Sequence, residues 1–354
     1  MAPPTRSGTS FRPLLVELTG LVVAVVLGVA LAEAYLTAYN PQNLMTPAYE
    51  DGEGMRLYTP DTVIKNRNRY FDAVYTTNAL GLRGPLYPTA KPKGVYRIVA
   101  LGPSFTFGIG VDDAQTYCRL IEKKLQAAWR RPVQVINMGQ PGISMNNYEP
   151  LYRRLIKDYD PDLLLVYPPL WTLNEADVVK RGSFYGTDRT EIGSAVRLRR
   201  WLRKLRRVPG YAFLCEHSNL LALLRLRVAT NIDADALART PASRPENGER
   251  LERTWTRTFE SFVDAVSCAK GAAGTRILML RNTAEGRDFH IIDRYLSRRS
   301  ARGRCFKVLD LAMRPEYTYV GEGHWNPRGH EFVADSVVAF LGAQKAAAAL
   351  ASAR

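Results

Sequence analysis

Ser104 and His324 are residues whose types and positions suit covalent catalysis. Each lies in a loop that follows an apolar run, residues 95–101 for the serine and 305–311 for the histidine. A serine hydroxyl becomes a good nucleophile when a histidine accepts its proton. Glu322, two residues before His324, could orient the imidazole as the acid of a triad, or it could be a carboxylate of a surface loop. These residues predict acyl transfer through an ester on Ser104.

Three groups could stabilise the negative oxygen that develops on an attacked carbonyl. They are the backbone N–H groups of Ser104 and Gly142 and the side-chain amide of Asn174, all in loops after apolar runs. Each also has a structural interpretation. Ser104 and Asn174 could cap helices, and Gly142 could serve a tight turn. The agreement of several loops favours the catalytic interpretation.

These loops need a scaffold that brings them to one edge. Apolar runs at 95–101, 133–138, 163–167, 276–281 and 305–311 predict strands, and amphipathic segments at 114–129, from about 145, and at 252–270, 289–299 and 327–341 predict helices. Such alternation is typical of a mostly parallel sheet between helical layers. Ligands of these sheets bind beyond the carboxyl ends of the strands, where the candidate loops meet.

The order of four sequence blocks resembles the SGNH/GDSL superfamily of serine esterases. The blocks are residues 102–111, which begin Gly-Pro-Ser, residues 137–142, Asn174, and residues 323–330. The resemblance covers roughly residues 70–342. It implies a three-layer α/β/α fold and the hydrolysis or transfer of ester-linked acyl groups.

The resemblance also implies roles for single residues. Ser104 would be the nucleophile, His324 the base, and Gly142 and Asn174 the oxyanion donors together with the N–H of Ser104.

Two positions depart from the family pattern. Pro103 stands beside the serine where the family has an aspartate, which removes side-chain hydrogen bonds from that loop. Gly321 stands three residues before His324, where the family commonly has its acid, and this leaves Glu322 as the candidate.

The N-terminal residues 1–36 predict a membrane signal. Residues 14–36 are mostly apolar, with Glu17 and Glu33 near the two ends, and are long enough to span a bilayer. Arg6 and Arg12 precede them. This charge distribution keeps the N-terminus in the cytoplasm and places the main domain outside it, in a periplasmic or extracellular location. Ala-Leu-Ala at 30–32 resembles a cleavage site, so a secreted protein with a removed signal is the alternative to an anchored one.

The remaining organisation is a linker and irregular lead-in at 37–94, a catalytic domain at 95–345 with a basic helical insert at about 180–250, and a tail at 346–354. The run from Arg197 to Arg207 carries seven basic residues among eleven, with apolar residues at helical spacing. It predicts an amphipathic helix that lies on anionic lipid or over the mouth of the active site. The alternative is a solvated helix that packs on the domain through one apolar stripe.

Composition excludes several other classes of protein. The 49 Lys and Arg residues against 34 Asp and Glu give a net charge of +15, but no nucleic-acid-binding motif is present, and export would remove that partner. Four scattered cysteines without a Cys-x-x-Cys pair favour neither a disulfide scaffold nor a metal site. We therefore expect no cofactor, no metal and no nucleic acid. His330 is expected to be structural.

Together, these features predict an exported, membrane-anchored serine esterase or O-acyltransferase. The substrate would be an ester-linked acyl group, such as acetyl, on a glycan or lipid. Hydrolase and transferase share the first half of the reaction, so both remain open. The alternative from another class is a catalytically inactive scaffold or glycan-binding protein of the same fold, which Pro103 and the displaced acid make credible.

Overall fold

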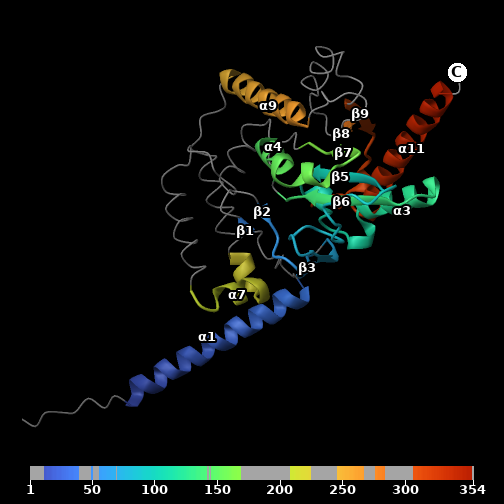
Figure 1. The fold of residues 1–354 in the computed structure, drawn as a ribbon. Coiled ribbons are helices and arrows are strands. Elements are labelled where there is room, and N and C mark those ends of the chain that lie inside the picture. The colour runs from blue at the N-terminus through green and yellow to red at the C-terminus, as the bar shows by residue number, and fades with distance from the viewer. Residues whose placement is uncertain are drawn as a thin grey trace, which may run out of the picture.

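The computed structural model describes residues 12–39, 49–50, 56–68, 70–141, 143, 145–168, 208–224, 245–266, 276–283 and 306–352. A parallel sheet forms their centre (Figure 1). Its strands are β5 Tyr96–Gly102, β6 Val133–Gly139, β7 Leu163–Val166, β8 Arg276–Asn282 and β9 Phe306–Leu311. They lie side by side in the order β6-β5-β7-β8-β9, and every neighbouring pair is parallel.

Helices cover both faces of this sheet and make three layers (Figure 1). The helices α3 Tyr117–Trp129 and α11 Pro327–Ser352 pack on one face. The helices α4 Tyr148–Leu151 and α9 Pro245–Ala265 pack on the other. The predicted α/β/α fold with a mostly parallel sheet is thereby confirmed.

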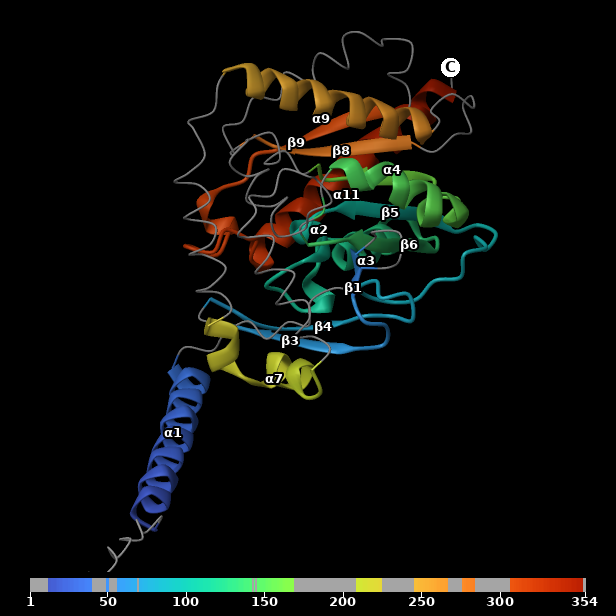
Figure 2. The same cartoon turned by 90° about the vertical axis from the view of Figure 1, so that its left-hand side faces the viewer.

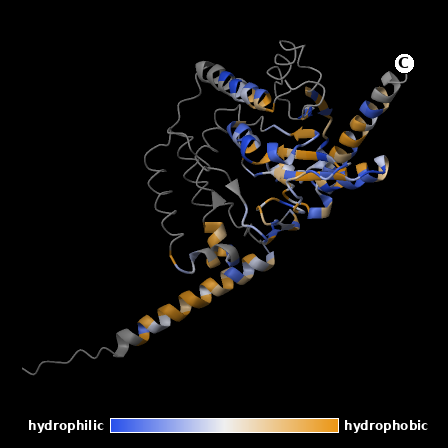
Figure 3. Cartoon of the chain, in the orientation of Figure 1, coloured by the Kyte–Doolittle hydropathy of each residue, from blue (hydrophilic) through white to orange (hydrophobic). Residues whose placement is uncertain are grey.

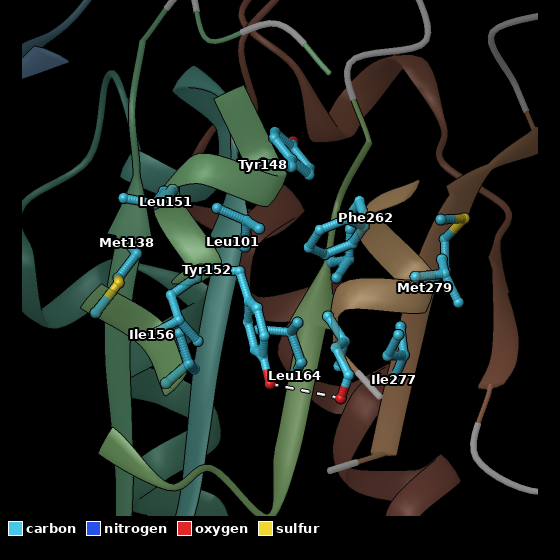
Figure 4. Close-up of a cluster of buried hydrophobic side chains, with 14 of the residues drawn as sticks. Leu101, Met138, Tyr148, Leu151, Tyr152, Ile156, Leu164, Phe262, Ile277 and Met279 are labelled. Carbon is cyan, nitrogen blue, oxygen red and sulfur yellow. Dashed lines mark hydrogen bonds between the residues drawn. The ribbon is translucent and has the colours of Figure 1, made fainter. Parts of the chain in front are cut away.

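Successive residues of the central strand face opposite layers. In β5, Ile98 and Ala100 are buried in the core beneath α3 and α11, whereas Val99 and Leu101 are buried in the core beneath α4 and α9. Figure 4 shows this second core, with Phe262 of α9 among the side chains that meet over the sheet. Because both faces are covered, such strands carry apolar residues without polar alternation, which is the pattern that predicted them.

An antiparallel hairpin lies beside the loop that follows β5 (Figure 2). It consists of β3 Val63–Arg67 and β4 Asp72–Thr76, whose inner side chains form an aromatic cluster with that loop. A shorter pair, β1 Tyr49–Glu50 with β2 Arg56–Leu57, precedes it. The described part of the 37–94 lead-in thus contains short strands that the sequence analysis did not locate. Five-residue strands that alternate exposed and buried positions are too short for their periodicity to stand out.

The predicted start of α3 is wrong by three residues. The structure forms a 3-10 turn, Asp113–Gln115, which Asp112 caps, and α3 then begins at Tyr117. The cap of α3 is Thr116, whose side chain accepts a hydrogen bond from the N–H of Arg119.

The last helix is longer than predicted. We expected α11 to end near residue 341 and a tail to occupy 346–354, but the helix continues to Ser352. The added turns are mostly alanine, the residue with the highest helix propensity.

Some predictions fall outside the described residues. These are the helix at 289–299 and the basic run from Arg197 to Arg207. From the predicted insert, the structure describes α7 Tyr211–His217, a further helical turn that ends at residue 224, and the start of α9.

The helix α1, Arg12–Tyr39, extends away from the domain (Figures 1 and 3). Among the described residues, one helix is long and apolar enough to cross a membrane, and it is Val16–Tyr39 of α1. Most of its large apolar side chains are exposed.

Candidate active site

The side chains of Ser104 and His324 meet at the carboxyl end of the sheet. The Oγ of Ser104 lies 2.7 Å from Nε2 of His324. On the other side of the imidazole, Oε1 of Glu322 lies 2.6 Å from Nδ1, and its Oε2 accepts the backbone N–H of His324 at 2.8 Å. These are the contacts of a serine–histidine–carboxylate triad, formed across 220 positions of sequence.

The serine opens a short helix directly after the central strand. The strand β5 ends at Gly102, and α2, Ser104–Phe107, begins two residues later, with Pro103 at its N-cap. The first N–H groups of a helix have no acceptor within that helix. The backbone N–H of Ser104, at the first position of α2, therefore donates to no carbonyl within that helix.

The site lies where the order of the sheet reverses. From β5 the chain passes to β6 on one side and then crosses to β7 on the other, and parallel sheets bind their ligands at such a reversal. The loops that follow β5 and β6 pack main chain against main chain. The N–H of Gln140 donates to the carbonyl of Gly102 at 2.9 Å, and a Cβ on Gly139 would lie 2.1 Å from the backbone nitrogen of Phe107. Glycine at 139 is required for this approach.

Two of the predicted oxyanion donors fall outside the described residues. These are Gly142 and Asn174, and their roles stay predictions.

A buried arginine that the sequence did not single out holds the serine loop. The guanidinium of Arg83 is almost fully buried and donates to the carbonyls of Phe107, Gly108 and Val111. Its Nε also lies 2.7 Å from a carboxylate oxygen of Asp113. Burial lowers the pKa of Arg83, and Asp113 opposes that effect. The arginine thus satisfies carbonyls that the end of α2 leaves without partners.

The side-chain amide of Asn137 supports the same turn from β6. Its Nδ2 donates to the carbonyl of Thr106 at 2.9 Å, and its Oδ1 accepts the N–H of Gly139 at 2.9 Å. Pro103 cannot supply side-chain hydrogen bonds to this loop. Arg83 and Asn137 therefore hold the serine loop with hydrogen bonds that the side chain of Pro103 cannot make.

The histidine loop explains how an acid two residues before the histidine reaches the imidazole. Gly321 and Gly323 have φ values of 84° and 93°, in the left-handed region that favours glycine. The N–H groups of Glu322 and Gly323 both donate to the carbonyl of Tyr319, which closes a tight turn. The turn directs both carboxylate oxygens of Glu322 toward His324.

Electrostatics keep this carboxylate charged. Burial alone would raise the pKa of Glu322, but the hydrogen bonds and charge of His324 outweigh burial and hold that pKa below its usual value. An ionised carboxylate at Nδ1 fixes the proton there and leaves Nε2 free to accept a proton from the serine.

His330 lies apart from this chemistry, as expected. It is fully buried on α11, and its Nδ1 accepts the backbone N–H of Tyr117 at 3.2 Å. Burial, together with the charges of Arg83 and His324, lowers its pKa to about 3. Within the part of the chain that the structure describes, no group of three or more His, Cys, Asp or Glu side chains is arranged to hold a metal ion.

The comparisons with known proteins concern the fold. No family model matches the sequence, and no curated protein matches it. Among solved structures, similarity is found to a lipase from a goat rumen metagenome, at 13% identity over 69% of this chain and 96% of that chain, with a TM-score of 0.37. A lipase/acylhydrolase from Enterococcus faecalis has 13% identity over 70% and 96%, with a TM-score of 0.38. A catalytic mutant of an acetylxylan esterase from Geobacillus stearothermophilus has 9% identity over 69% and 92%, with a TM-score of 0.34. A putative lipolytic protein of the G-D-S-L family from Desulfitobacterium hafniense is also similar, at 12% identity over 68% of this chain and 97% of that chain, with a TM-score of 0.34.

Proposed function

We propose that this protein is a membrane-tethered serine esterase of the SGNH type. The observation that carries the proposal is the unbroken series of contacts from the hydroxyl of Ser104 through the imidazole of His324 to the carboxylate of Glu322. A serine in a structural turn needs neither an imidazole nitrogen at 2.7 Å nor a carboxylate behind that imidazole.

The proposed reaction has two halves. In the first, Nε2 of His324 accepts the proton of Ser104 as Oγ bonds to the ester carbonyl carbon. The tetrahedral intermediate then collapses, the bond to the alcohol oxygen breaks, and His324 returns the proton to that alcohol. In the second, a water molecule attacks the Ser104 ester in the same way and releases the carboxylic acid.

The other residues have distinct proposed roles. The carboxylate of Glu322 keeps the imidazole oriented and stabilises its protonated form. The N–H groups of Ser104 and Gly142 and the amide of Asn174 would donate hydrogen bonds to the oxyanion of each intermediate. An O-acyltransferase would use the same groups, with a sugar hydroxyl in place of water in the second half.

The proposed location sets the class of substrate. We propose that α1 anchors the protein with its N-terminus in the cytoplasm and the catalytic domain outside. The length of Val16–Tyr39 and the exposure of its apolar side chains support this role. An esterase held there would meet acylated glycans and lipids outside the cytoplasm, and we propose acetyl as one such acyl group.

A fluorophosphonate probe tests the nucleophile in the full chain in detergent. We expect labelling of the unaltered protein, loss of labelling in Ser104→Ala and His324→Ala, and normal labelling in Ser336→Ala. The last is a control, because the Ser336 hydroxyl bonds the carbonyl of Phe332 within α11. Folded protein that takes up no probe would instead support the inactive scaffold or glycan-binding alternative.

Product analysis separates hydrolase from transferase. An acetylated polysaccharide donor would be incubated with an unacetylated polysaccharide acceptor. Free acetate alone is the result expected of an esterase. Acetyl groups on the acceptor would assign the protein to the transferases.

A further inference from the structure

The segment 208–224 carries exposed apolar side chains that the proposed catalysis does not use. Val208, Phe213, Leu214 and Leu224 are 50%, 61%, 52% and 53% exposed. His217 stacks on Phe213, with 4.1 Å between the ring centroids, yet the phenyl ring stays largely exposed. So many large apolar side chains in a stretch of this length usually mark a contact surface.

This segment is attached to α1 at one place. The carboxylate of Glu33 accepts hydrogen bonds from the hydroxyl of Ser218, from the backbone N–H groups of Asn219 and Leu220, and from the Asn219 side-chain amide. The same amide contacts the hydroxyl of Thr37 at 3.0 Å. A carboxylate in an otherwise apolar helix is costly near lipid unless it is fully hydrogen-bonded. The 208–224 segment supplies those bonds.

The length of α1 places this attachment at the membrane surface. At 1.5 Å per residue, about 20 residues cross the roughly 30 Å hydrocarbon layer. Counted from residue 14, that span ends at Glu33. Tyr35 and Tyr39 follow and are 61% and 77% exposed, and the centroids of their rings lie 5.3 Å apart. Exposed aromatic residues are typical of the boundary between lipid and water.

We infer that residues 208–224 form a second membrane contact, which lies in the outer interface of the bilayer beside the end of α1. Figures 1 and 2 both show α7 next to the C-terminal part of α1. The inferred occupant of the apolar surface is therefore the same bilayer that surrounds α1, with Phe213 and Leu214 in the upper acyl region. The inference rests on the proposed anchoring role of α1. Two contacts, rather than one, fix how the catalytic domain is oriented over the membrane.

Photolabelling of the full chain tests this. The protein would be reconstituted into phosphatidylcholine vesicles that contain a diazirine lipid with its reactive group in the upper acyl chain, and adducts would be mapped by mass spectrometry. We expect adducts on α1 and on the peptide that contains Phe213 and Leu214. We expect several-fold fewer on residues 343–347, an exposed stretch of α11 at the far end of the molecule from α1 (Figure 1).

Each other outcome has a defined meaning. Adducts on α1 without adducts on 208–224 would overturn the inference and leave the anchor intact. Absence of adducts on both would overturn the inference and the anchor together. If 208–224 takes up neither the lipid probe nor a water-soluble diazirine, a protein partner covers it, and the inference is wrong.

Variants of α1 test the attachment. Glu33→Ala removes the acceptor of four hydrogen bonds and should lower lipid adducts on 208–224 while labelling of α1 stays unchanged. Glu17→Ala, at the exposed opposite end of α1, is the matched control and should leave both unchanged. Equal labelling of 208–224 in the two variants would show that Glu33 does not hold this segment at the membrane.

Discussion

Replacement of Glu322 by glutamine is the sharpest test of the proposed triad. The carboxylate accepts from Nδ1 of His324 at 2.6 Å and from its backbone N–H at 2.8 Å. A carboxamide keeps the shape but loses the charge. Its NH₂ can also donate to Nδ1, and that would place the imidazole proton on Nε2, where it blocks acceptance of the Ser104 proton.

The size of the effect follows from the geometry. A carboxylate and an imidazolium at 2.6 Å attract by about 6 kcal/mol at an effective dielectric constant of about 20. The two side chains are 18% and 24% exposed, so water screens part of this attraction, and about 3 kcal/mol is a reasonable remainder. That amounts to about a hundredfold in rate, and the wrong tautomer can extend the loss to about ten-thousandfold.

The assay is steady-state hydrolysis of p-nitrophenyl acetate by the full chain in detergent, with thermal unfolding as a check on folding. We expect Glu322→Gln to lower kcat by these factors and to change KM little. Glu316→Gln is the control, because Glu316 lies nearby and forms an exposed pair with Arg314 at 3.7 Å. A Glu322→Gln variant that folds normally and keeps kcat within threefold of the unaltered protein would refute the triad.

Three further predictions concern the supports of the site. Arg83→Met should lower the unfolding free energy by several kcal/mol, because three buried carbonyls lose their hydrogen-bond donor. The control, Arg67→Met at an exposed position, should change the unfolding free energy by less than about 0.5 kcal/mol. Similar melting temperatures of the two variants would contradict this prediction. Because the pKa of His330 is about 3 when folded and about 6.5 when unfolded, the unfolded state binds more protons between these values, and stability falls as pH drops below about 6.5. From pH 7 to pH 5, the unfolding free energy of the unaltered protein, measured by urea unfolding, should fall by about 2 kcal/mol more than that of His330→Gln. An equal fall in the two proteins would argue against a buried neutral imidazole. Gly139→Ala should abolish labelling by the fluorophosphonate probe, because the added Cβ would collide with the backbone of the serine loop. In the control, Gly342→Ala, the added Cβ meets no atom within 4 Å, and labelling should be unchanged. Labelling of Gly139→Ala would show that the loops after β5 and β6 can move apart without loss of the site.

The sheet was predictable because each strand is covered on both faces. Residues 95–101, 133–138 and 276–281 are mostly apolar, and each strand observed there begins and ends within one residue of the predicted bounds. The position of the candidate site followed from the same topology, since loops at the carboxyl ends of parallel strands converge. The spacing of Ser104 and His324 along the chain carried no information of its own about their contact.

The supports of the site were not predictable, because they depend on contacts distant in sequence. Arg83 lies in a stretch rich in glycine and proline, where an arginine is normally solvated. Its burial depends on the aromatic cluster of the hairpin, and its guanidinium lies 4.2 Å from the centre of the Tyr75 ring. The contact of Glu322 with His324 depends on the left-handed backbone conformation of Gly321 and Gly323. The sequence shows that glycine permits this conformation, but it does not show that these two glycines adopt it.

The position of the two reacting groups in the chain has a consequence for biosynthesis. Ser104 follows the first strand of the sheet, whereas His324 precedes only the last helix, which packs against α3 and is linked to it through Lys124 and Asp335. During synthesis, Ser104 is therefore made long before His324, the residue proposed to activate it. Under the proposed mechanism, the growing chain lacks its base until the histidine loop has been made, and a protease that cuts α11 would inactivate the enzyme although α11 carries none of the three proposed triad residues.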